Sequence, residues 1–142
     1  MSAWNDPAVA EKMLRNYRTW AVVGCSDDPH RASHGVARFL DEIGFKVLCV
    51  NPNHDSCIQG LPCYPDLRSI EEPIDVVDIF RRSEAVLPHV QEAVEVGAKG
   101  VWMQLGVVNH EAARLADEAG LDVVMDRCPK IEFRPAFLQK EA

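Results

Sequence analysis

The chain has 142 residues, of which 47% are hydrophobic and 26% are charged, and its formal net charge is −7. This length and composition are typical of one globular domain spanning residues 1–142, and the acidic balance argues against a general nucleic-acid binder. No apolar run approaches the roughly 20 residues of a membrane helix, and residues 1–16 lack the apolar segment of a secretory signal. We therefore expect a cytoplasmic protein with neither a nucleic-acid nor a membrane partner.

The first 18 residues are expected to form a helical extension of the main fold. Asp6 followed by Pro7 predicts a helix start, because Asp caps free N–H groups and Pro is tolerated at the first helical position. Val9, Met13 and Tyr17 supply one apolar stripe, so we expect this helix to pack against the outside of a sheet.

From residue 20 onward, predicted strands alternate with predicted helices. The helices are expected to begin near Ser33, Ser83 and Asn109, residue 54 opens a loop that reaches residue 65, and residues 131–142 form a tail. The alternation predicts an α/β fold, namely a single Rossmann-like doubly wound domain with a mainly parallel five-stranded sheet and helices on both faces. The predicted strands are 20–23, 46–50, 75–80, 100–104 and 122–125.

The connection between the first strand and its helix is the first candidate binding element. Gly24 ends the strand, Ser33 is expected to cap the helix, and Gly44 is expected to stop it. Such a turn directs free backbone N–H groups at a phosphate. The glycine fingerprint of dinucleotide sites is incomplete, because Ser26 and Pro29 occupy two of its positions. A plain strand-to-helix connection therefore remains the alternative.

Polar and cationic residues follow every predicted strand. Because the carboxyl ends of parallel strands share one edge of the sheet, we expect these residues to converge there. Several cations on one edge of an acidic chain favour an anionic ligand with more than one phosphate. The residues are Gly24, Cys25, Ser26 and Arg31 after the first strand, Asn51, Pro52 and Asn53 after the second, Arg81 and Arg82 after the third, Gln104 and Gly106 after the fourth, and Asp126, Arg127, Cys128 and Lys130 after the fifth.

Other interpretations of this edge are open. Arg81 and Arg82 could be solvated, or paired with Asp78 and Glu84. A nicotinamide dinucleotide site is disfavoured, because it needs an acid after the second strand, where the chain has neutral asparagines.

Catalytic and metal-binding patterns are weak. The odd cysteine count lacks a C-x-x-C pair and fits neither a disulfide framework nor a zinc site. Cys25 and Cys128 are candidate thiolate nucleophiles near a phosphate, or simply small residues in tight turns. No metal site is expected from the histidines, which are His30, His34, His54, His89 and His110.

Several sequence blocks, in order, resemble the small bacterial CoA-binding proteins. They are similar to the CoA-binding domain of the succinyl-CoA synthetase α subunit and of ADP-forming acyl-CoA synthetases. The resemblance covers nearly the whole chain beyond the first helix. The blocks are residues 22–26, 31–37, 50–53, 75–82, 101–106 and 124–130.

The resemblance implies a Rossmann-type domain with coenzyme A as its ligand, and it assigns residues to parts of that ligand. The first loop and helix start are implied to hold the phosphates, the segment after the second strand to lie by the adenosine, and the next two strand ends to line the rest. Cys25 stands in this loop where a small residue such as alanine is usual, and Asp27 and Asp28 add two acids. The implied residues are Gly24, Ser26, Arg31, Ser33 and Gly35, then Asn51, Pro52 and Asn53, then Arg81, Arg82, Gln104 and Gly106.

The resemblance carries ligand binding but no synthetase activity. The synthetases need a second domain with a phosphorylated histidine and an ATP-grasp partner, and no segment after residue 125 is long enough for the former. We therefore expect a non-catalytic carrier, sensor or regulatory module for CoA or an acyl-CoA. The alternatives are a thiol-dependent CoA redox or acyl-transfer enzyme and a CoA-binding subunit of a larger acyl-CoA synthetase. A homo-oligomer and a separate catalytic partner chain both remain open.

Overall fold

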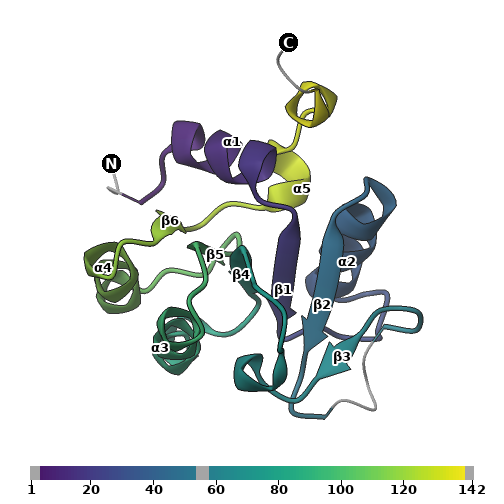
Figure 1. Cartoon of the computed structure of the whole chain (residues 1–142), viewed down its shortest axis with the longest axis horizontal. Helices are drawn as coiled ribbons and strands as arrows, with labels where there is room; N and C mark the ends of the chain where they lie inside the picture. The colour runs from purple at the N-terminus through teal and green to yellow at the C-terminus, as the bar shows by residue number, and fades with distance from the viewer. Residues whose placement is uncertain (1–3, 54–57, 140–142) are drawn as a thin grey trace.

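The computed structural model describes residues 4–53 and 58–139, which form a six-stranded parallel sheet with helices on both faces (Figure 1). The order across the sheet is β3-β2-β1-β4-β5-β6, and every pair is parallel. The strands are β1 (Thr19–Val23), β2 (Lys46–Val50), β3 (Cys63–Tyr64), β4 (Val76–Ile79), β5 (Gly100–Met103) and β6 (Asp122–Val124).

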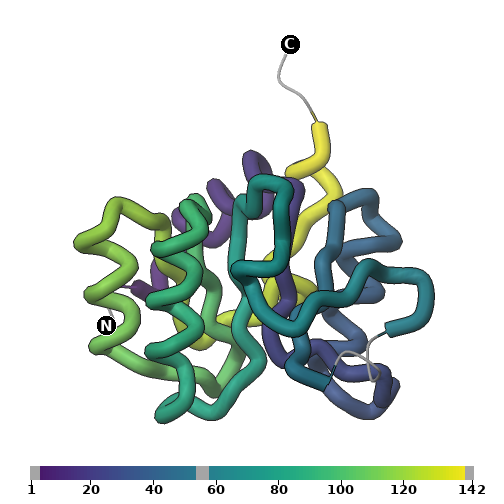
Figure 2. Tube along the Cα trace, turned by 60° about the horizontal axis from the view of Figure 1, so that its bottom comes forward, coloured from purple at the N-terminus to yellow at the C-terminus, as the bar shows by residue number. Residues whose placement is uncertain are grey.

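Five α-helices and three 3-10 helices accompany the sheet in the described part of the chain. Helices α3 and α4 lie side by side (Figure 2). The α-helices are α1 (Pro7–Asn16), α2 (Ala32–Glu42), α3 (Leu87–Glu95), α4 (His110–Glu118) and α5 (Pro129–Glu132). The 3-10 helices are η2 (Leu67–Ser69), η3 (Ser83–Ala85) and η4 (Pro135–Leu138).

Both faces of the sheet are covered, which explains the nearly continuous apolar runs of its strands. Helices α3 and α4 cover the face that carries Ala21, Val77 and Val101. Helices α1, α2 and α5 cover the opposite face, where the indoles of Trp20 and Trp102 lie with ring centroids 5.6 Å apart.

The topology predicts where a ligand binds. From β1 the chain proceeds to β2 on one side, and after β3 it returns to β4 on the other side of β1. The segments that follow β1 and β4 therefore diverge, and open α/β sheets bind ligands in the crevice at this switch point.

The predicted fold class is confirmed, but the sheet has six strands where the sequence predicted five. The additional strand, β3, falls in the predicted loop 54–65, and its two residues are too few to show a period-two pattern. The predicted tail also contains a helix and a 3-10 helix, and Phe133 and Phe137 bury their rings under α1 and α2.

The helix caps agree with the sequence in part. Asp6 accepts a hydrogen bond from the Ala8 N–H group at 2.9 Å, and Asn109 accepts one from Ala112 at 2.9 Å, as predicted. Ser33 is not a cap, because α2 begins one residue before it. Ser83 lies in η3 rather than capping α3, and its hydroxyl accepts from the Val108 N–H group.

Three further observations bear on what the sequence predicted. Cys63 is disulfide-bonded, which the odd cysteine count did not indicate. His54 and Cys57 lie outside the described residues. No helix in the described ranges is both long and apolar enough to span a bilayer.

Candidate functional site

A cavity of about 380 Å³ opens at the switch point, between the segments that follow β1 and β4. Six residues predicted for the site line it, together with two that the sequence analysis did not name, Ala32 and Phe80. Ala32 follows Arg31 and Phe80 precedes Arg81, so the exact ends of the helix and the strand would have indicated both residues. The six predicted residues are Gly24, Ser26, Arg31, Ser33, Asn51 and Arg81.

The floor of the cavity depends on the turn at Gly24. Its φ is +85°, a conformation that favours glycine, and its N–H group donates to the carbonyl oxygen of Val50 at 3.0 Å. A Cβ atom here would lie 2.3 Å from the carbonyl oxygen of Phe80. Only glycine therefore allows β1 to turn this close to the end of β4.

The acidic pair in the first loop does not line the cavity. Asp28 folds the turn instead: its carboxylate accepts from the N–H group of His30 at 2.9 Å, and its own N–H group donates to the Ser26 hydroxyl at 3.1 Å. Asp27 is exposed. Asp28 therefore shapes the loop, Asp27 lies at the surface, and the cavity wall is formed by neutral and cationic groups.

Helix α2 starts at the cavity with free donors. Its cap residue, Arg31, makes no side-chain cap, and the N–H groups of Ala32 and Ser33 have no acceptor within the described residues. Because these two residues line the cavity, unpaired donors and the positive end of the helix dipole lie at its wall. This arrangement is suited to an anion.

Two guanidinium groups lie at the same cavity. Across the described part of the chain, no carboxylate pairs with Arg31 or Arg81, and the Nε of Arg81 is buried without an acceptor. Burial, followed by the charge of Arg81, lowers the pKa of nearby His89, so this imidazole is neutral at pH 7. The neighbouring Arg82 is exposed and is not among the described residues that line the cavity.

Asn51 connects the segments after β1 and β2. Its Nδ2 donates to the carbonyl oxygen of Cys25 at 2.7 Å, and its Oδ1 accepts from the N–H group of Asn53 at 2.9 Å. Pro52 and Asn53 are exposed, and neither is among the described cavity-lining residues. The predicted trio after β2 thus contributes one side chain to this wall.

Four other predicted residues lie outside the cavity lining. Cys25 is fully buried in the core beside Cys49, and Gly35 is one turn into α2 with open space around it. Gln104 is 6% exposed, and its Oε1 has no partner in the described structure. Gly106 donates its N–H to the Asp126 carboxylate at 2.7 Å, which holds the loop after β5 against the loop after β6.

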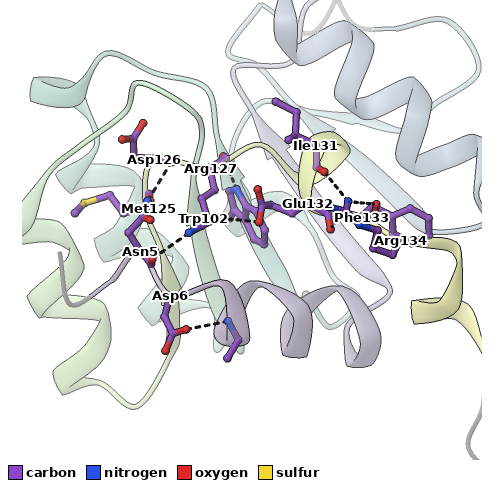
Figure 3. Close-up of polar contacts among 11 residues, drawn as sticks. Asn5, Asp6, Trp102, Met125, Asp126, Arg127, Ile131, Glu132, Phe133 and Arg134 are labelled. Carbon is purple, nitrogen blue, oxygen red and sulfur yellow. Dashed lines mark hydrogen bonds and ion pairs between the residues drawn. The ribbon is translucent and has the colours of Figure 1, made fainter. Parts of the chain in front are cut away.

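Arg127, which follows β6, joins the N-terminal segment to α5 and does not line the cavity (Figure 3). Arg127 pairs with Glu132 at 2.8 Å and donates to the carbonyl oxygen of Asn5 at 3.2 Å. The indole N–H of Trp102 donates to the carbonyl oxygen of Arg127 at 2.8 Å. Asp126 meets the loop after β5 through Gly106, as expected for neighbouring strand ends. None of the four residues expected here lines the cavity among the described residues, because the segment after β6 runs under α1; the four are Asp126, Arg127, Cys128 and Lys130.

The sequence did not indicate that the carboxyl group of Asp78 would be buried in the sheet. The sequence left Asp78 open as a partner of Arg81 or Arg82, but its carboxyl group is fully buried in β4, between Val22 of β1 and Trp102 of β5. Neither carboxyl oxygen has a hydrogen-bond partner in the described structure. Burial raises the pKa of Asp78 well above its usual value.

Asp78→Asn is expected to reduce the pH dependence of stability. Because the folded-state pKa of Asp78 is raised, the folded chain keeps the Asp78 proton at pH values above about 3.9, where the unfolded chain has lost it. Stability therefore falls as the pH rises toward the folded-state pKa, by at most about 1.4 kcal/mol per pH unit. We expect the variant to match wild type near pH 4 and to exceed it at pH 8, as measured by urea unfolding. If the free energies of unfolding of the two proteins changed with pH in parallel, the raised pKa of Asp78 would be contradicted.

Comparisons with known proteins identify the family to which this sequence is similar. Residues 18–134 match the family described as CoA binding domain. The Bacillus subtilis protein YneT is 38% identical over 89% of this chain and 94% of its own length. A Pyrococcus horikoshii structure superposes with a TM-score of 0.84 at 37% identity and covers 89% of both chains. The Archaeoglobus fulgidus ADP-forming acetate–CoA ligase I is 25% identical over 76% of this chain, which spans 17% of the ligase.

Among described residues, no group of three His, Cys, Asp or Glu could hold a metal ion.

Proposed function

The chain belongs to the CoA binding domain family, and from that premise we propose that it binds coenzyme A or an acyl-CoA with the pyrophosphate in the switch-point cavity. The proposal includes a non-catalytic role as a carrier, sensor or regulatory module. The observation that carries it is the meeting of two guanidinium groups, on Arg31 and Arg81, with the N–H groups that open α2, none of which has a partner within residues 4–53 and 58–139.

The cavity wall supplies what a pyrophosphate needs. Each guanidinium can form charge-assisted hydrogen bonds with phosphate oxygens, and the helix start adds donors together with the favourable end of its dipole. A buried donor such as Arg81 Nε, which has no acceptor in the described part of the chain, is costly, and an anionic ligand removes that cost. The protein as a whole is acidic, so this cationic wall is local.

The segment after β2 favours CoA over a nicotinamide dinucleotide. A carboxylate at this position usually accepts from the ribose 2′-hydroxyl of NAD. Asn51 and Asn53 occupy the segment here, and Asn51 already engages the first loop. Neutral amides suit a ribose that carries a 3′-phosphate, because they add no negative charge beside it.

A second candidate is a CoA-binding subunit that serves a separate catalytic chain. It is favoured by the Pyrococcus furiosus acetate–CoA ligase II subunit alpha, which is 33% identical over 61% of this chain. This chain spans 19% of that subunit, so the ligase activity itself does not transfer. Stable co-purification with an ATP-grasp protein would support this candidate, and a lone chain at native expression levels would contradict it.

Thermal unfolding and calorimetric titration with CoA, dephospho-CoA, NAD and ATP test the proposed function. We expect CoA to raise the Tm by several degrees at saturation, because a ligand that binds only the folded state stabilises it. Arg31→Ala is expected to weaken CoA binding about tenfold, the loss typical of one charge-assisted hydrogen bond from an exposed side chain. Stabilisation by NAD but not by millimolar CoA would overturn the proposal.

A further inference from the structure

Two buried cysteines lie in contact directly behind the first loop. The Cys25 thiol donates to the Cys49 sulfur, and the two Sγ atoms are 2.7 Å apart. Both residues are 0% exposed, both are free thiols, and both belong to the core under α2. A disulfide bond is about 2.05 Å long, so closing the pair needs a sulfur movement of about 0.7 Å.

Register explains why the two side chains meet. Cys49 of β2 is paired with Val22 of β1, and both side chains point to the face covered by α2. The positive φ at Gly24 then turns the chain so that Cys25 also enters this core. Cys25 follows Gly24 and precedes Ser26, two residues that line the cavity, and its carbonyl oxygen accepts from Asn51.

We propose that Cys25 and Cys49 form a reversible disulfide under peroxide and that this bond weakens ligand binding in the adjacent cavity. The second half of the proposal rests on the proposed function, while the first half stands on the thiol pair alone.

The chemistry balances with a peroxide as the oxidant. The Cys49 thiolate attacks one peroxide oxygen, the O–O bond breaks, and hydroxide leaves, so that Cys49 becomes a sulfenic acid. The Cys25 sulfur then attacks the Cys49 sulfur, the S–O bond breaks, and water leaves with the Cys25 proton. Two electrons and two protons pass from the thiols, and hydrogen peroxide becomes two waters. A dithiol reductant reverses the disulfide by exchange.

The environment distinguishes the two sulfur atoms. The hydrogen bond between them, together with burial, raises the pKa of the Cys25 thiol. The same hydrogen bond lowers the pKa of Cys49, because it stabilises the thiolate that accepts it. We assign Cys49, which accepts the hydrogen bond, as the attacking group and Cys25, which donates it, as the resolving one.

The bond is expected to displace the first loop rather than the strand before it. Gly24 cannot shift toward β4, since it already lies against the Phe80 backbone. Asn51 holds the Cys25 carbonyl. When Cys25 moves toward Cys49, Ser26 and the exposed residues after it are therefore expected to shift. Because Ser26 lines the cavity, this shift changes the cavity wall.

Peptide mapping after hydrogen peroxide treatment of the dithiothreitol-reduced protein tests the bond. We expect tryptic peptides 19–31 and 47–68 to be linked, and the link to disappear with dithiothreitol. Because peptide 47–68 also carries Cys57 and Cys63, and reduction opens the disulfide of Cys63, fragment ions must assign the link to Cys25 and Cys49. Cys128→Ala, which removes the other described free thiol, should form the same link, whereas Cys49→Ala should not. Peroxide treatment that leaves Cys25 unlinked in the wild type would overturn the proposal, whatever the variants do.

CoA titration of the reduced and oxidised proteins tests the consequence. We expect oxidation to weaken CoA binding about tenfold in the wild type and in Cys128→Ala, with recovery after reduction. Binding to Cys49→Ala should be insensitive to peroxide. Equal affinities for linked and reduced wild type would refute the coupling. If reduced protein binds no CoA, the proposed function fails instead, and the mapping result still decides whether the disulfide forms.

Discussion

Gly24→Ala is expected to lower the free energy of unfolding by about 2–4 kcal/mol, the range typical of a strained backbone combined with a core clash. The new Cβ would lie 2.3 Å from the carbonyl oxygen of Phe80, and the φ of +85° is unfavourable for alanine. The first loop must then move away from β4, so CoA binding should be lost as well. Urea unfolding followed through the buried indoles of Trp20 and Trp102 measures the stability change.

Gly35→Ala is the matched control for this substitution. A Cβ at Gly35 has no heavy atom within 4 Å, and the residue lies inside α2, where alanine is the better helix former by about 1 kcal/mol. We therefore expect unchanged or slightly increased stability. A Gly24→Ala protein as stable as Gly35→Ala would mean that the turn does not depend on glycine.

Arg81→Ala is expected to weaken CoA binding about 100-fold, or about 3 kcal/mol, the upper end for hydrogen bonds to a charged group. Arg81 is partly buried at the cavity and its Nε has no acceptor in the described structure, so a phosphate there would bind a desolvated guanidinium. The fold should be retained, because no hydrogen bond or ion pair among described residues depends on this side chain. Calorimetry gives the affinity, and the Tm without ligand reports on folding.

Arg82→Ala provides the comparison within the same dipeptide. Arg82 is exposed and does not line the cavity among the described residues, so solvent and salt screen its charge. We expect its loss to change the affinity by less than about threefold, or under 1 kcal/mol. Equal effects of the two substitutions would place the phosphate elsewhere on the strand edge.

The periodicity of the sequence was sufficient for the fold class and for most element positions. The strand at 46–50 has the predicted bounds, and Asn109 caps α4 as predicted. These features are local, because an apolar strand covered on both faces and a capping side chain act within a few residues. The two-residue β3 could not be predicted, since it exists only by pairing with β2.

By itself, the sequence determined a parallel α/β sheet with a glycine turn and polar residues at the strand ends, because alternation, glycine turns and strand-end residues are local features of the chain. Only the tertiary structure decided which donors share a cavity: Arg81 lines it and Arg82 does not, while Arg127 pairs with Glu132. It also placed Cys25 against Cys49 and buried Asp78 with no hydrogen-bond partner among the residues that the structure describes. Such outcomes depend on side chains brought together from distant strands, and no local pattern records which of two adjacent residues will face a cavity.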